Sequence, residues 1–491
     1  MRTLFHNAKI YSMQSEDSVW AAMLVENGEV KELFSETPEL ADVQKIDLNG
    51  KYIYPGFIDT HTHSFEGGLY SLGADLNSAQ TIAQVKQILA ETKPVSGLIF
   101  AYQLDERKLA EERFPTIAEL DAIFPDTPVL LRRIDGHSCV INTAAASKIE
   151  WQEKLPANFN GLLNKRWNDV AATWFHNQVD AAGIWQAYEK AAQIGLKSGH
   201  TAIHTMIGDG NSDPQHCEMI FANSERFGLE FIPYPQITDV EMAVKLKSPR
   251  IGGCILADGS FGSHTAAVKQ AYTDNPESKG NLYHSDEFWL KLIEKAHAHD
   301  LQIAIHCIGD RAIEQILTCY EKVQNADFKN LNHQIIHAEL TSDTMLDRIK
   351  NSGVSLAMQP MFDRLWAGKA GMYEKLLGKQ RTSHTNRLAS IFKRNILVTG
   401  GSDWYVTPLD AIGGIQAAVN IHNVDERISP YHALEMYTTN AARLSSDEGR
   451  IGVLKTNSQA DFVVTDQDIL HSHNIGKIKI EQVYKKGKKL I

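Results

Sequence analysis

The stretch Tyr54-Pro-Gly-Phe-Ile-Asp-Thr-His-Thr-His63 is typical of a buried β-strand that ends in two histidines. His61 and His63 are two residues apart, so on an extended strand both imidazoles point to the same side. Such a pair can grip a metal ion, but two histidines at this spacing also occur by chance. The strands that follow decide between these interpretations.

Three later apolar runs of strand length end in the same way. They are Ile303-Ala-Ile-His306, Gln334-Ile-Ile-His337 and Val398-Thr-Gly-Gly-Ser-Asp403. Polar side chains at the carboxyl ends of parallel strands converge, and mixtures of histidine and carboxylate suit zinc, iron or manganese. The sequence therefore predicts a site for a divalent transition metal, with His61, His63, His306, His337 and Asp403 as its candidate ligands.

The central part of the chain alternates apolar runs of strand length with amphipathic segments of helix length. The expected strands cover residues 98–102, 128–134, 201–206, 229–234, 252–257, 301–307, 333–338, 354–359 and 395–400. A helix is predicted from Ser285 to His299, with Asp286 and Glu287 in its first turn. Continuously apolar strands that alternate with helices indicate an α/β fold with a parallel sheet covered on both faces. The number of units favours a closed (β/α)8 TIM barrel over an open doubly wound sheet.

The two ends of the chain differ from this pattern. Residues 3–54 and 459–491 hold short strand-like runs, with Asn27-Gly28, Asn49-Gly50 and Lys486-Gly487 as hairpin turns. Neither end has enough apolar surface to stand alone, so we expect them to pair into one small β-domain. The predicted domains are residues 1–54 with 447–491, and a barrel at residues 55–446.

An insertion is expected around residues 135–190, where the alternation stops. It holds Trp151, Trp167, Trp174 and Trp185, four of the eight tryptophans of the chain. Both a lid over the substrate and a small packed subdomain fit this composition.

The composition of the chain limits the classes of partner that we expect it to bind. With 49 Lys and Arg against 60 Asp and Glu, the formal net charge is −11, which argues against nucleic acid or an anionic membrane as partner. The five cysteines include no CxxC pair and suit a reducing compartment. The N-terminus lacks an apolar signal segment and no run is long enough to span a membrane. We expect a soluble cytoplasmic protein with a small-molecule substrate, and a homo-oligomer by analogy with many other barrel proteins.

Several segments together resemble one protein family. PGFIDTHTH resembles the opening signature of the amidohydrolase superfamily, and the rest resembles its amidohydrolase-3 or YtcJ-like branch, which includes N-substituted formamide deformylases and exoenzyme regulatory proteins. The carrying segments are residues 135–142 (DGHSCVIN), 257–266 (ADGSFGSHTA), 305–312 (IHCIGDRA), 337–340 (HAEL), 401–403 (GSD) and 449–461. The resemblance covers nearly the whole chain in the family's order. It implies a metal-bearing (β/α)8 barrel with a β-sandwich made from both termini.

The resemblance also implies a mechanism. It assigns His61, His63, His306, His337 and Asp403 to a site for one or two divalent transition metal ions, zinc first. A divalent ion there lowers the pKa of its water to about 7, and Asp403 can take the proton from this water and pass it to the leaving amine. Asp403 is thus the expected catalytic residue, acting as both base and acid.

The sequence departs from the family on the strand before Asp258. Relatives with two metals usually bridge them with a carboxylated lysine, but Cys254 stands at that place. A thiolate is a good zinc ligand, whereas a free cysteine is more often a small buried hydrophobe. If Cys254 does not coordinate, the site holds one metal on His61, His63, His306 and Asp403, and His337 lies near the substrate.

A second set of polar residues matches family motif positions and is expected to orient the substrate. Its members are His137, Asp258, Ser260, His264 and Arg311. In the family His264 is more commonly arginine. A DGS sequence also forms turns, and Arg311 beside Asp310 also suits a structural ion pair, so an architectural role is equally open for Asp258, Ser260 and Arg311.

Three functions are compatible with these features. The first is a metal-dependent hydrolase of a C–N bond in an amide, N-acyl or N-formyl group. The second is an aminohydrolase that deaminates a ring carbon with the same metal chemistry. The third is a catalytically inactive regulatory or binding barrel, against which the full set of five residues argues.

Overall fold

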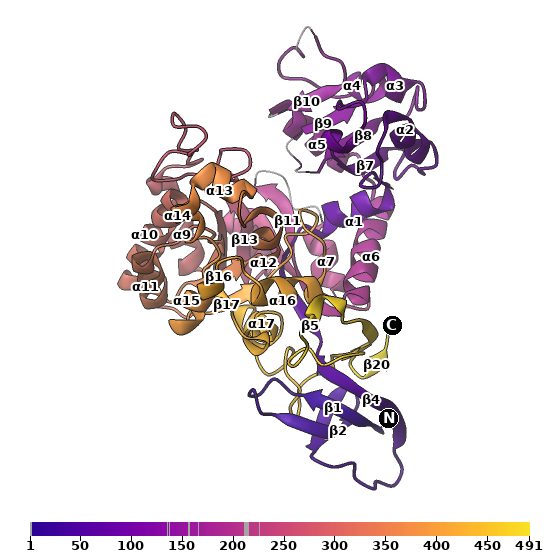
Figure 1. Ribbon diagram of the computed structural model, residues 1–491, viewed down its shortest axis with the longest axis vertical. Helices are drawn as coiled ribbons and strands as arrows, with labels where there is room; N and C mark the ends of the chain where they lie inside the picture. Colours follow the sequence, from indigo (N-terminus) through magenta and orange to yellow (C-terminus); the bar gives the residue numbers. More distant parts are fainter. Residues whose placement is uncertain are drawn as a thin grey trace. The chain divides into compact units, whose positions relative to one another are not determined.

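The chain forms two compact units. The computed structural model describes residues 2–134, 136, 138–155, 158–164, 166–210, 216–224 and 226–491 (Figure 1). The larger unit consists of Met1–Thr62 with Ile194–Ile491, and the smaller unit of His63–Gln193. The smaller unit includes residues 135–190, but the predicted domain boundaries and the lid stay predictions.

One seven-stranded sheet in the larger unit is built from both ends of the chain. Its order is β20-β19-β18-β4-β1-β2-β3. The strands are β1 (Arg2–Tyr11), β2 (Val19–Glu26), β3 (Glu29–Phe34), β4 (Gln44–Pro55), β18 (Phe462–Thr465), β19 (Ile480–Lys485) and β20 (Lys488–Lys489). Strand β4 joins the two ends, because it pairs in parallel with β1 and antiparallel with β18. The expected β-domain from both termini is present as this sheet.

Two of the three predicted hairpin turns of this sheet are confirmed. Asn27-Gly28 joins β2 to β3 and Lys486-Gly487 joins β19 to β20, each with two positive φ angles. The prediction for Asn49-Gly50 was wrong, because β4 continues through both residues. They form a bulge opposite β1, where the register shifts, and Asp47 Oδ1 accepts hydrogen bonds from the Asn49 N–H (2.8 Å) and the Asn7 side chain (2.7 Å).

The larger unit also holds two parallel sheets. The first has the order β12-β11-β5, and the second runs from β13 to β17 in chain order. Their bounds are β5 (Phe57–Thr62), β11 (His200–Gly210), β12 (Glu230–Ile237), β13 (Arg250–Leu256), β14 (Gln302–Cys307), β15 (Gln334–His337), β16 (Ser355–Met358) and β17 (Val398–Gly400). Strand β12 contacts β13, and a parallel bridge joins Thr62 to Trp404 just after β17.

One apolar core serves both parallel sheets. Its buried side chains include Ile58 of β5, Ala202 of β11, Ile232 of β12, Ala304 of β14 and Ile336 of β15. Strands β5, β14, β15, β16 and β17 are buried along their whole length, as continuously apolar parallel strands require.

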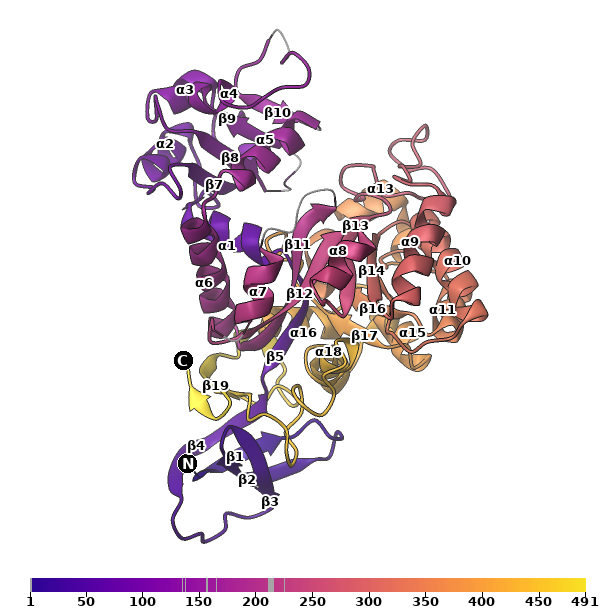
Figure 2. The ribbon, with the colours of Figure 1, turned by 180° about the vertical axis from the view of Figure 1, so that it is seen from behind.

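Helices connect and cover these strands. The predicted helix at residues 285–299 is confirmed as α9 (Asp286–Ala298), since Ser285 is its N-cap and accepts a hydrogen bond from the Phe288 N–H. Helices α9 and α10 pack against β14, and α11 packs against α10 (Figure 2). The other helices of this unit are α7 (Cys217–Asn223), α8 (Val240–Lys245), α10 (Asp310–Ala326), α11 (Asp343–Ser352), α12 (Pro360–Trp366), α13 (Met372–Leu377), α14 (Lys379–Thr382), α15 (Leu388–Lys393), α16 (Ala411–Val419), α17 (Pro430–Met436) and α18 (Thr439–Leu444), with the 3-10 turns η2 (Val424–Glu426) and η3 (Ile475–Lys477).

The smaller unit has a sheet of its own, in the order β10-β9-β8-β7-β6. Its elements are α1 (Ser64–Leu72), β6 (Ala74–Asp75), α2 (Ile82–Ala90), β7 (Ile99–Leu104), η1 (Glu106–Lys108), α3 (Ile117–Asp121), β8 (Val129–Arg133), β9 (Ser138–Ile141), α4 (Thr143–Ala146), β10 (Leu162–Asn164), α5 (Arg166–Asn177) and most of α6 (Ala181–Lys197). The runs at 98–102 and 128–134 are strands as expected, but as β7 and β8 they belong to this sheet and not to the sheets of β5 and β13. Their buried apolar pattern is the same in either sheet, so the pattern alone does not assign them.

No helix in the described part of the chain is both long and apolar enough to cross a membrane.

Candidate metal centre

The predicted metal ligands lie at the carboxyl ends of parallel strands. His61 lies on β5 and His306 on β14, His337 is the last residue of β15, and Asp403 follows β17. His63 follows β5 and is the first residue of the smaller unit. Four of these side chains are buried, and that of His63 is half-buried.

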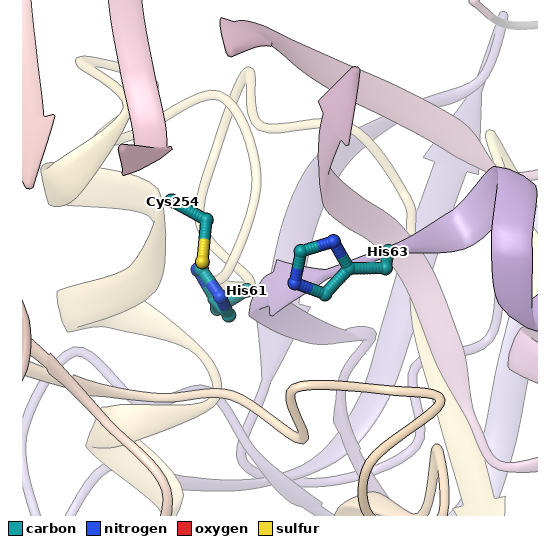
Figure 3. A group of neighbouring side chains, drawn as sticks. All are labelled: His61, His63 and Cys254. Atoms are coloured by element: carbon teal, nitrogen blue, oxygen red, sulfur yellow. The ribbon is translucent and has the colours of Figure 1, made fainter. Parts of the chain in front are cut away.

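Three groups of donors fit a metal ion among the described residues. The groups are His61 with His63 and Cys254, Cys254 with His306 and His337, and His61 with His337 and Asp403. Within each group the donor atoms lie within 4.8 Å of one another. Figure 3 shows the first group, in which the Cys254 sulfur points toward the His61 ring. The structure therefore brings the predicted residues together, and Cys254, whose role the sequence left open, lies among them.

This donor set suits a transition metal. It consists of imidazole nitrogens, one carboxylate and one thiol, which are the ligand types of zinc sites. The hard cations magnesium and calcium prefer oxygen ligands, of which Asp403 alone supplies one in these three groups. The residues present thus fit the metal that the sequence predicts.

Backbone contacts between β5 and the loop after β17 fix His61 and Asp403. The Asp403 N–H donates to the His61 carbonyl (2.8 Å), and His61 Nε2 lies 3.2 Å from Asp403 Oδ1. Buried Asp59 accepts from the N–H of His61 (3.0 Å) and from the N–H of Ser402 (3.0 Å). Asp59 therefore holds together the two segments that carry the imidazole and the carboxylate.

Gln359, at the end of β16, fixes the ring of His337. His337 Nδ1–H donates to Gln359 Oε1 (2.6 Å), while Gln359 Nε2 donates to the Ala357 carbonyl (3.4 Å). The ring also stacks on Phe362, with 5.6 Å between ring centroids. This arrangement leaves Nε2 of His337 as the nitrogen that can bind a metal.

In His306 the other ring nitrogen, Nε2, makes the hydrogen bond. Its Nε2–H donates to the Gly259 carbonyl (3.2 Å), and Asp258 Oδ1 lies 3.7 Å from the same nitrogen. Its Nδ1 lies 3.8 Å from Cys254 Sγ. Nδ1 is therefore the nitrogen that His306 presents to the donor group.

The electrostatics of the centre favour a cation. Burial acts to lower the pKa of both the His61 and the His306 imidazoles, but their neighbouring side chains outweigh it. Asp403 and Cys254 raise the pKa of His61, and Cys254 with Asp258 helps to raise the pKa of His306 to about 9. Groups that stabilise a proton on these rings also stabilise a metal cation in its place.

Asp258 and Ser260, two of the five predicted substrate residues, take part in the loop after β13. Asp258 is fully buried and accepts hydrogen bonds from the N–H groups of Ala267, Ile308 and Gly309, at 2.8 to 2.9 Å. Burial raises the pKa of this carboxyl to about 6, although the same N–H groups act to lower it. The Ser260 hydroxyl lies 2.9 Å from that of Ser263. These contacts match the architectural role left open for both residues.

Of the other three predicted substrate residues, His264 and Arg311 are described, and neither is a member of the donor groups. His264 pairs with Asp274, with Nε2 3.0 Å from the carboxylate oxygens. Arg311 is exposed in the first turn of α10. His137 lies outside the described residues. Contact of any of these five residues with a substrate stays a prediction.

Sequence reasoning did not single out Asp59 and Gln359. Each carried a signal, because Asp59 lies in the opening histidine segment and Gln359 is the polar residue that ends the predicted strand at 354–359. The rule that found His306 and His337, a polar residue at the end of an apolar run, finds Gln359 too.

Comparison with known proteins gives the family. The sequence model of the amidohydrolase family matches residues 44–491. The putative amidohydrolase YtcJ of Bacillus subtilis is 28% identical over 95% of both chains, and the N-substituted formamide deformylase of Arthrobacter pascens is 22% identical over 94% of this chain and 93% of the relative. A crystal structure of an uncharacterized metal-dependent hydrolase from Pyrococcus horikoshii OT3 superimposes with a TM-score of 0.83, at 25% identity, over 97% of this chain and 99% of that one.

Proposed function

The chain belongs to the amidohydrolase family, and we propose that it is a metal-dependent hydrolase that cleaves a carbon–nitrogen bond in a small molecule. The bond is an amide in an N-acyl, N-formyl or cyclic group. The observation that carries this proposal is the meeting of buried His61, His306, His337 and Asp403 at the ends of separate parallel strands. An open metal beside a carboxylate is the arrangement that hydrolysis needs.

The fold that we propose for this site is a (β/α)8 barrel. Strands β5, β11 and β12 form one arc and β13 to β17 the other. The contact of β12 with β13 and the Thr62–Trp404 bridge support closure of the two arcs. The terminal sheet is then the β-sandwich, with domain boundaries near residues 54 and 447. In a barrel, the carboxyl ends of the strands carry the chemistry.

His61, His63, His306, His337 and Asp403 would hold the metal, for which we propose zinc. When bound, such an ion supplies a water whose pKa is about 7 and polarises the carbonyl of the scissile bond. Asp403 takes the proton of the attacking water and delivers it to the leaving nitrogen. Gln359 and Asp59 hold the imidazole of His337 and the carboxylate of Asp403 in place for this transfer.

We propose a cytoplasmic location and keep Ser260, His264, Arg311 and His137 as candidates for substrate contact. For Asp258 we propose that it also positions His306, because its Oδ1 lies 3.7 Å from Nε2 of that ring. Three backbone N–H groups already donate to the same carboxylate, which holds it in place.

A substrate screen tests the function. Zinc-loaded protein should hydrolyse at least one class among N-acyl amino acids, N-substituted formamides and cyclic amides, and release a carboxylate and an amine or an opened ring. Release of ammonia from an aminated heterocycle, without amide cleavage, would favour the deaminase instead. Tight binding of a panel member without turnover would favour a regulatory barrel and contradict the proposal.

A further inference from the structure

We propose that the thiolate of Cys254 is a metal ligand shared by two ions. This inference deepens the proposed function and rests on it. His61, His63 and Cys254 form one donor group and Cys254, His306 and His337 form another, so the sulfur belongs to both. His61 and His337 also belong to two groups each, but an imidazole nitrogen has one lone pair and binds one ion, whereas a thiolate sulfur has several lone pairs and can bridge two ions.

A glycine bulge turns Cys254 toward the histidines. In the pairing of β13 with β14, Gly252 lies opposite Ala304 and Ile255 opposite Ile305, so Gly253 and Cys254 are additional residues. Gly252 and Gly253 have φ angles of +89° and +102°, which other residues rarely adopt. A Cβ on Gly252 would lie 2.2 Å from the Ala304 carbonyl oxygen. Bulges re-aim side chains next to active sites, and this bulge includes Cys254.

The contacts of Cys254 match a ligand better than a core residue. Its Sγ lies 3.8 Å from His306 Nδ1, and it shares donor groups with His61 and His337 in which the donor atoms lie within 4.8 Å of one another. The backbone is fixed as well, because Gln236 Nε2 donates to the Cys254 carbonyl (3.2 Å). Buried Cys307, whose sulfur lies on the Ile305 carbonyl, belongs to none of the donor groups found among the described residues.

A thiolate in the centre has a consequence for metal choice. Soft sulfur ligands favour zinc over manganese or magnesium, which prefer oxygen. We therefore expect the two-ion site to select zinc or cobalt, and Cys254 to be the residue that sets this preference.

Cobalt substitution tests the proposal without using activity. Protein reconstituted with Co²⁺ should bind about two equivalents and show a sulfur-to-cobalt charge-transfer band in the near ultraviolet. Cys254→Ser should lose this band and fall to about one equivalent, since the remaining donors still hold one ion. Cys307→Ser, a buried cysteine on the neighbouring strand, is the matched control and should keep both the band and the stoichiometry.

The outcomes separate this inference from the function on which it rests. Cobalt binding without a sulfur band in the unmodified protein, or a band that persists in Cys254→Ser, contradicts the ligand role of Cys254 alone. Failure to bind any cobalt contradicts the metal-dependent function itself. If Cys254→Ser does not fold, serine variants of Cys139, Cys217, Cys307 and Cys319 decide: a band that all four retain belongs to Cys254, and a band that any of them loses does not.

Discussion

The hydrogen bond between His337 and Gln359 shows how single residues prepare this centre. A metal-binding imidazole usually donates its other ring N–H to an acceptor, which fixes its tautomer and orientation, and Gln359 Oε1 accepts from Nδ1–H of His337 at 2.6 Å. His306 uses the carbonyl of Gly259 for the same purpose. The two rings therefore present opposite nitrogens, Nε2 and Nδ1, to the donor group.

Removal of the Gln359 acceptor should weaken metal binding. Gln359→Leu is expected to lower zinc affinity by about 10- to 100-fold, because the His337 ring loses its fixed orientation. Gln359→Glu keeps an acceptor for Nδ1–H and should stay within a few-fold of the unmodified protein. Zinc titration with a competing chelator measures both, and equal affinities in the two variants would refute a role in orienting His337.

Asp403 carries the proton transfer in the proposed mechanism. Asp403→Asn should lower turnover about 10²- to 10⁴-fold while the fold is retained, because an amide cannot take the proton of the water. The control is Asp347→Asn, an exposed aspartate of α11 that pairs with Arg394. Steady-state kinetics on the substrate found in the screen provide the test, and turnover retained in Asp403→Asn would assign the base to another group.

For single residues, the sequence predicted well which side chains converge at the metal centre. It predicted the role of each side chain less well. The rule that polar residues end apolar strands located His306, His337 and Asp403, which the structure brings to one place with His61. It gave no information on hydrogen-bond partners, because these depend on tertiary contacts. Asp258 shows this limit, since its carboxylate is directed at three backbone N–H groups that come from two other segments.

Among the elements, β13 is the one whose irregularity matters for the centre. Its glycine pair makes the bulge that carries Cys254, whereas the neighbouring β14 is regular. A run of strand residues from 252 to 257 was predictable from apolar character. The bulge was not, because its register is set by the partner strand.

A side chain at Gly252 should disturb β13. Gly252→Ala combines a φ of +89° with a Cβ 2.2 Å from a backbone oxygen, so we expect a loss of at least about 2 kcal/mol in the free energy of unfolding, together with reduced metal content. Gly50→Ala is the matched control, since Gly50 has a φ of +73° but no atom within 4 Å of the place that a Cβ would occupy, and it should lose only about 1 kcal/mol. Urea denaturation measures both losses, and equal losses would show that the contact with Ala304 is unimportant.

Two Asn-Gly pairs show why local sequence does not settle every element. Asn27-Gly28 and Asn49-Gly50 both have positive φ angles, as the residue types favour. The first reverses the chain and the second only bulges it, because β4 continues beside β1 after residue 50. The partner strand, which is far from local in sequence, makes the difference.

For the whole molecule, the sequence predicted the strands but not which sheet each strand joins. The runs at 98–102 and 128–134 have the buried apolar character of parallel strands, and they form such strands in the smaller unit. Burial on both faces imposes the same residue types in any sheet, so only the long-range pairing reveals which sheet a strand joins.

Buried histidines should make global stability depend on pH. Burial lowers the pKa of His333 to about 3, so the unfolded chain binds this proton below pH 6.5 while the folded protein does not. Stability is therefore lost as pH falls from 6.5 toward 3, by up to about 1.4 kcal/mol per pH unit for this one group. His333→Gln should flatten the dependence in that window, and His473→Gln, at an exposed position, should not. Urea denaturation at several pH values measures the slopes, and identical slopes in the two variants would contradict this assignment.

The metal content of the purified protein tests the central claim most directly. Elemental analysis of protein prepared without added metal, followed by thermal denaturation before and after chelation, is the measurement. We expect at least about one equivalent of a divalent transition metal, a lower melting temperature after its removal, and recovery when zinc is returned. A folded, metal-free protein whose melting temperature responds to neither chelator nor zinc would contradict the metal-dependent function.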